Sequence, residues 1–138
     1  MNEIQTSNIQ PQNEMTNHNL PKVFDLRERL MRFSINVLSI CRFLPQIHEG
    51  DVIRRQLARS GTAIGANFEE ADGALTKKDF INKVAIARKE AKETIYWLKL
   101  AKNTFSLNDY IDLQINETDE VIRILSTILK KSGYKFRM

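Results

Sequence analysis

The sequence predicts an all-α protein that folds as an antiparallel up-down-up-down four-helix bundle. Turn-forming residues are scarce, with five glycines and three prolines in 138 residues, whereas β-sandwiches need turn signals about every 8–12 residues. From Asp25 onward, apolar residues recur at alternating spacings of three and four, which is the period of an amphipathic helix. The breaks between these patterns are short, and short connections place consecutive helices antiparallel.

The first two patterns have recognisable ends. Pro45 should end the first helix at or before Leu44, because proline disfavours helical backbone in the residue before it. Asp51 is expected to cap the second helix, and Gly73 to end it. The expected core positions are Leu26, Leu30, Phe33, Val37, Ile40 and Leu44 in the first helix, and Ile53, Leu57, Gly61, Ile64, Phe68 and Ala71 in the second.

The third and fourth patterns are equally regular. Thr76 to Asp79 resembles a capping box and should begin the third helix. Gly133 should stop the fourth. The expected core positions are Phe80, Val84, Ala87, Ala91, Thr94, Leu98 and Ala101, followed by Ile111, Ile115, Thr118, Ile122, Leu125 and Leu129.

Composition divides the chain into three parts. Residues 1–22 are rich in Asn and Gln and are predicted to be a disordered tail. Residues 23–132 form the bundle, and residues 133–138 form a basic C-terminal tail. We expect no secretory signal, and no apolar run approaches the roughly 20 residues needed to span a bilayer. The single cysteine, Cys41, is expected in the core and is compatible with a reducing cytosol, so we expect a cytoplasmic protein.

Apolar residues outside the expected core predict self-association. They form a second stripe on the first helix, a group on the third and a widened apolar arc on the fourth. Clustered apolar surface often marks an interface, although a core that wraps further round these helices would explain the same pattern. The candidate interface residues are Met31, Ile35, Leu38, Tyr96, Trp97, Leu100, Ile124 and Ile128.

A polar stripe flanks the apolar face of the second helix. Gln56, Ser60, Asn67 and Glu70 follow helical spacing, with small residues between them. Buried polar groups need hydrogen-bond partners, so these residues are expected to pair with another helix and fix its register. The alternative is a catalytic or ligand-binding role.

Basic residues predict nucleic-acid binding. Arg54, Arg55 and Arg59 lie in a run without acids, and guanidinium groups bind phosphates bidentately. Lys77, Lys78, Lys130 and Lys131 are further candidates, the last two near aromatic residues of the tail.

The distribution of charge along the chain leaves open a second interpretation of the basic residues, in which acidic residues of the same chain neutralise them. Residues 76–105 carry eight basic and three acidic groups, and residues 109–129 carry one and five. These two segments could lie side by side and largely neutralise each other.

The motifs and residue pairings that enzymes commonly use are missing from this sequence. The two histidines, His18 and His48, occur in no Glu-x-x-His motif, and Cys41 has no helical histidine near it. There is no P-loop, and the adjacent Glu69 and Glu70 point about 100° apart on a helix. The sequence therefore predicts a protein that is not an enzyme, without catalytic residues, metal ligands or cofactor.

Residues 56–71, with Lys78, Phe80, Glu93, Tyr96 and Leu98, resemble the 23S rRNA-intervening-sequence family of four-helix bundles. The resemblance implies a ring-like homopentamer and kinship with the accessory variability determinant of diversity-generating retroelements, a basic pentamer associated with reverse transcriptase and nucleic acid. It also implies that Arg59, Asn67 and Glu70 are motif residues with structural roles or roles in subunit contacts.

Two functions fit these observations. The first is a non-catalytic, oligomeric accessory protein that binds RNA or DNA with little sequence specificity. The alternative is a structural ring that binds a protein partner, such as a reverse transcriptase, and has no nucleic-acid role.

Overall fold

The computed structural model describes residues 22–136, and for residues 22–25 it describes the backbone alone. Within this range the chain forms four helices and no strand, which confirms the all-α prediction. The helices are α2 (Lys22–Phe43), α3 (His48–Asp72), α4 (Lys77–Phe105) and α5 (Asp109–Lys131). The predicted disordered tail lies outside the described residues except for Lys22, with which α2 begins.

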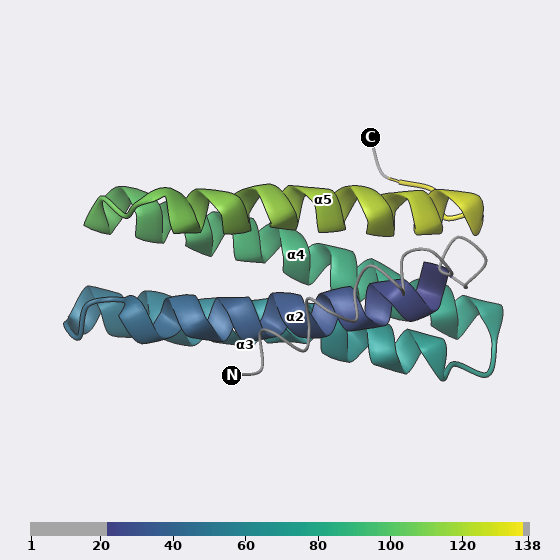
Figure 1. Cartoon of the computed structure of the whole chain (residues 1–138). Helices are drawn as coiled ribbons and strands as arrows, with labels where there is room; N and C mark the ends of the chain where they lie inside the picture. Colours follow the sequence, from purple (N-terminus) through teal and green to yellow (C-terminus); the bar gives the residue numbers. More distant parts are fainter. Residues whose placement is uncertain (1–21, 137–138) are drawn as a thin grey trace, which may run out of the picture.

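Consecutive helices run in opposite directions along the bundle (Figure 1). The most extensive contacts join α3 to α4. Those of α4 with α5 and of α2 with α3 are less extensive. Among the helix pairs that are in contact, the first and last helices, α2 and α5, pack together least extensively. No helix in the described part of the chain is long and apolar enough to cross a membrane.

One predicted helix end is wrong. Helix α3 begins at His48 and its N-cap is Ile47, not Asp51. The Asp51 amide already donates a helical hydrogen bond to the Ile47 carbonyl at 2.9 Å, and the Asp51 carboxylate instead forms an ion pair with Arg54.

The other predicted ends agree with the structure. Thr76 accepts a hydrogen bond from the Asp79 amide at 3.0 Å, as the capping prediction required. Gly73 ends α3 with φ −94°, a conformation open to any residue, whereas Gly133 follows α5 with φ +90°.

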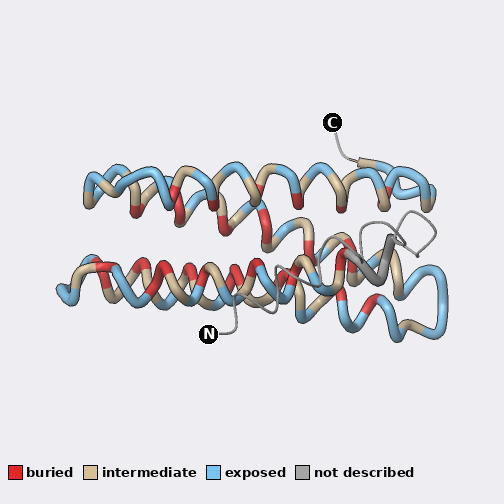
Figure 2. The backbone as a smooth tube through the Cα atoms, viewed as in Figure 1, coloured by how far each residue is buried: buried red, intermediate tan, exposed pale blue. Residues whose placement is uncertain are grey.

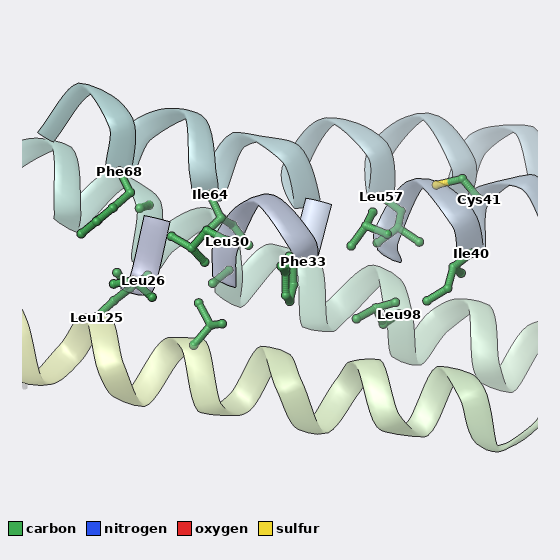
Figure 3. Close-up of a cluster of buried hydrophobic side chains, with 14 of the residues drawn as sticks. Leu26, Leu30, Phe33, Ile40, Cys41, Leu57, Ile64, Phe68, Leu98 and Leu125 are labelled. Carbon is green, nitrogen blue, oxygen red and sulfur yellow. The ribbon is translucent and has the colours of Figure 1, made fainter. Parts of the chain in front are cut away.

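The core lies along the inner faces of the four helices (Figure 2). Figure 3 shows side chains such as Leu30, Phe33 and Ile64 gathered between them. All six core positions predicted for the first helix are buried, including Leu44 just beyond the end of α2, and so is Cys41. On α4, Phe80 is only half-buried.

Helix α5 is rotated relative to the prediction. Gln114 and Val121 are buried, while Ile115 and Ile122 are half-buried. Ion pairs on both edges of α5 match this rotation: Glu117 binds Arg29 of α2, and Asp112 binds Lys102 of α4.

Candidate nucleic-acid interface

Arg54 lies at the turn between α2 and α3 and binds backbone there. Its Nε donates to the Cys41 carbonyl at 3.1 Å, and its Nη2 donates to the Leu44 and Pro45 carbonyls at 2.9 Å each. The last carbonyls of a helix have no partner within the helix. Arg54 therefore donates to one carbonyl in the last turn of α2 and to two carbonyls of the turn that follows it.

Arg59 reaches across to α4, although its side chain stays half-exposed. It forms ion pairs with Glu90 and Glu93, and Glu93 also accepts a hydrogen bond from Trp97 Nε1 at 2.9 Å. The hydrogen bond from Arg59 lowers the pKa of Glu93 below its usual range. Arg55 is the one member of the arginine run that is exposed without an ion pair to an acid among residues 26–136.

The outer face of α4 carries four exposed lysines, Lys78, Lys89, Lys92 and Lys99, which we call the lysine stripe. At 100° per residue they lie on the side of α4 opposite its buried residues. Tyr96, also exposed, lies among them. None of the four forms an ion pair with an acid among residues 26–136. The stripe is therefore a basic surface without direct acidic partners.

The acids of α5 do not neutralise the lysine stripe. Helices α4 and α5 are neighbours, but the only ion pair between them in the described residues is Lys102–Asp112, at 2.6 Å. Glu117 and Glu120 instead turn toward Arg29 of α2. The expected mutual neutralisation is therefore confined to one pair.

Sequence reasoning selected Lys78 but missed Lys89, Lys92 and Lys99. A signal was present, because positions 89, 92, 96 and 99 follow the helical spacing of three, four and three. The interleaved acids Glu90 and Glu93 concealed it, since they lie on the face directed toward Arg59.

The remaining basic candidates lie at the end of the bundle where α5 finishes (Figure 1). Lys77, Lys130 and Lys131 are exposed. Beyond Gly133 the chain returns along the bundle, and the Arg88 guanidinium lies 4.8 Å from the centre of the Phe136 ring. Tyr134 packs edge-to-face on Phe136 with ring centres 5.0 Å apart.

The candidate oligomer residues divide into two groups. Met31, Ile35 and Leu38 on α2 are 62%, 54% and 41% exposed, and we call them the α2 apolar patch. Tyr96 is exposed as well. The other four are partly buried and pack against the core of the same chain: Trp97, Leu100, Ile124 and Ile128.

The polar stripe of α3 reaches α4 at two of its four positions. Ser60 is buried, and its hydroxyl oxygen lies 3.0 Å from that of Thr94. Glu70 binds Lys83 at 2.6 Å. Gln56 accepts from Arg59, and Asn67 donates to the Ala63 carbonyl, so these two bond within α3.

Side chains that could bind a metal ion are not clustered in the described range. Residues 22–136 contain no cluster of three or more His, Cys, Asp or Glu side chains that could hold a metal ion. Burial raises the pKa of the Cys41 thiol, and its Sγ contacts the Arg54 carbonyl at 3.7 Å. The sulfur is thus kept as a neutral thiol in the core.

Fold and surface together define the class: an all-α four-helix bundle with a basic outer face on α4. Residues 23–127 match the family model described as 23S rRNA-intervening sequence protein, and the chain belongs to this family.

A solved structure supports the same assignment. It is a crystal structure from Bacteroides thetaiotaomicron, described as a protein with unknown function from the S23 ribosomal protein family. The match has 36% identity and a TM-score of 0.71, and it covers 75% of this chain and 97% of the other. Among curated proteins, none matches this sequence significantly.

Proposed function

We propose that this chain is a non-catalytic protein that binds nucleic acid with little sequence specificity, and that the lysine stripe of α4 is its contact surface. The observation that carries the proposal is the exposure of four lysines on one helix face without acidic partners. Such a face attracts polyanions, because each lysine that meets a phosphate releases condensed counterions.

The geometry of the stripe suits a phosphate backbone. Lys89 to Lys99 spans ten residues, or about 15 Å of helix, which is long enough to meet several phosphates. An ammonium group acts as a point charge on a flexible stem, so it follows the charge of a strand without reading its bases. Tyr96 adds an exposed ring on which a base of a single strand can stack.

The family description supports RNA as the first ligand to test, because it associates these proteins with 23S rRNA. Self-association strengthens the proposal. Two or more copies joined through the α2 apolar patch would display the lysine stripe repeatedly, and linked weak contacts bind far more tightly than one alone. The homopentamer comes from the family resemblance, whereas the exposed patch supports association only.

The decisive experiment compares two triple variants that lose the same charge. Lys89, Lys92 and Lys99 are replaced by Ala in one, and the ion-paired Lys83, Lys102 and Arg123 in the other. Labelled single- and double-stranded RNA and DNA are titrated by anisotropy at about 50 and 200 mM salt, a range over which multi-phosphate binding weakens strongly.

We expect the stripe variant to bind single-stranded RNA more weakly. The slope of log affinity against log salt concentration should become shallower by about 2, since each of the three lost phosphate contacts contributes about 0.7. The control variant should change both quantities much less. Equal losses in the two variants would contradict the lysine stripe as the contact surface.

A second candidate function rests on the α2 apolar patch. An exposed apolar group of this kind also fits a structural ring that binds a protein partner. Absence of any RNA or DNA binding at low salt would favour this second function.

A further inference from the structure

A hollow of about 260 Å³ lies between α4, α5 and the returning C-terminal segment. Five residues line it, and we call it the Arg88 hollow: Arg88, Ser126, Thr127, Lys130 and Phe136. It is smaller than the roughly 300–1,000 Å³ of ordinary small-molecule pockets. A small charged group suits it better than a large cofactor.

The lining is rich in donors and contains no carboxylate. Arg88 Nε donates to Ser126 Oγ at 2.7 Å, and no hydrogen bond from its two terminal nitrogens is formed with residues 26–136. Because the Ser126 oxygen accepts this bond, its own proton remains available for another acceptor. Lys130 is exposed and forms no ion pair with an acid in the same range. Two cations and a hydroxyl in one concavity suit an anion.

Phe136 holds the guanidinium in place. The ring lies 4.8 Å from the central carbon of Arg88, which is cation–π range. Together with the Ser126 bond, this contact fixes the plane of the guanidinium before any ligand arrives. A fixed planar fork loses little entropy when it binds two oxygens of one phosphate.

We propose that the Arg88 hollow binds a phosphate group of a nucleic-acid strand, with Arg88 as a bidentate ligand and Lys130 and Ser126 as additional donors. The nucleic-acid source rests on the proposed function. Arg88 lies one helical turn before Lys92, so the two side chains start about 5–6 Å apart. A strand that follows the lysine stripe therefore reaches the hollow. The phosphate is either a terminal monoester or a backbone diester, and the experiment distinguishes them.

The first measurement needs no strand binding. The full chain is titrated calorimetrically with adenosine 5′-monophosphate, with adenosine as the control ligand. We expect weak binding of the monophosphate at millimolar concentration and none of adenosine. Arg88→Gln should weaken binding of the monophosphate by about tenfold or more, since charge-assisted hydrogen bonds are lost. Lys130→Gln should weaken it less, through loss of one point charge.

Lys135→Gln is the matched control, because Lys135 is an exposed cation of the same segment that does not line the hollow. It should leave monophosphate binding nearly unchanged. Thermal unfolding of each variant checks that the bundle is intact. Equal affinity of the Arg88→Gln and unsubstituted proteins would overturn the proposal, and so would absence of monophosphate binding up to about 10 mM.

The second measurement identifies the source, using single-stranded RNA of about 12 nucleotides with and without a 5′-phosphate. For a terminal monoester, the phosphorylated strand binds more tightly and Arg88→Gln removes the difference. For a backbone diester, both strands bind alike and Arg88→Gln weakens both. If no strand binds while the monophosphate still does, the proposed function fails and the phosphate site remains. If strands bind and Arg88→Gln behaves like Lys135→Gln, the site fails and the proposed function remains.

Discussion

Gly61 of α3 lies directly against Val37 of α2. A Cβ atom built on Gly61 would lie 2.7 Å from Val37 Cγ1, closer than real side chains approach each other. One turn later, a Cβ on Gly65 would lie 3.5 Å from the nearest atoms of Leu30, an ordinary contact. The close approach of α2 and α3 therefore depends on glycine at position 61 and not at position 65.

Gly61→Ala should lower the free energy of unfolding by about 1–2 kcal/mol. Overpacking typically costs about 1–3 kcal/mol, and the better helix propensity of alanine returns up to about 1 kcal/mol. Gly65→Ala, the matched control, should be neutral or stabilising. Urea unfolding at neutral pH measures both, and equal stability of the two variants would contradict the close contact with Val37.

Arg54→Ala should destabilise the bundle by about 2–3 kcal/mol, because the Leu44 and Pro45 carbonyls of the α2–α3 turn lose their side-chain donor. Arg55→Ala removes the same charge from an exposed position and should stay within about 0.5 kcal/mol of the unsubstituted protein. Thermal or urea unfolding gives the comparison. A loss for Arg54→Ala as small as that of Arg55→Ala would show that its carbonyl contacts contribute little.

The Ser60–Thr94 hydroxyl pair should couple α3 to α4. Ser60→Ala removes one neutral hydrogen bond and should cost about 1 kcal/mol, because Thr94 keeps its bond to the Glu90 carbonyl at 2.8 Å. Thr94→Val leaves the buried Ser60 hydroxyl without this partner and should cost more. The double variant should cost less than the sum of the single ones, which a double-mutant cycle measures. Strict additivity would mean that the two hydroxyls do not interact.

Acid should weaken the Arg59–Glu93 ion pair. The pKa of Glu93 is lowered in the folded protein by the hydrogen bond from Arg59, and the ordinary value for glutamate is about 4.3. The contribution of this ion pair to stability is fully present when the pH is above the ordinary glutamate pKa. It is lost as the pH falls through the lower pKa that Glu93 has in the folded protein.

Urea unfolding between about pH 5 and pH 3 follows this loss. Glu93→Gln should reduce the slope of stability against pH, although partial exposure of both side chains keeps the effect modest. Glu28→Gln is the control, since Glu28 is exposed and has no ion pair with residues 26–136. Identical slopes for the two variants would contradict the expectation.

The α2 apolar patch should mediate self-association. Light scattering of the unsubstituted protein should give a multiple of the 16.0 kDa chain mass, and the double substitution Met31→Glu, Ile35→Glu should shift it toward one chain. Leu75→Glu is the control, because Leu75 is 97% exposed outside the patch. A mass of one chain for the unsubstituted protein at micromolar concentration would contradict the oligomer.

The sequence by itself determined the number of helices, most of their ends and most of the core. Periodicity places Leu30 and Leu57 on inner faces because burial of one helix face is a local pattern. The Thr76 cap could be predicted for the same reason, since its hydrogen bond to Asp79 spans only three residues. Local chemistry fixes such features before any helix meets another.

Only the tertiary structure decided which charges remain unpaired. Arg59 finds Glu90 and Glu93 more than 30 residues away, and Glu117 and Glu120 of α5 turn toward Arg29. An ion pair requires two side chains to meet across different helices, and that depends on how each helix is rotated about its axis. Lys89, Lys92 and Lys99 lie on the outer face of α4, opposite its buried residues, and pair with no acid among residues 26–136. The basic surface therefore emerged from helix packing rather than from the count of charges.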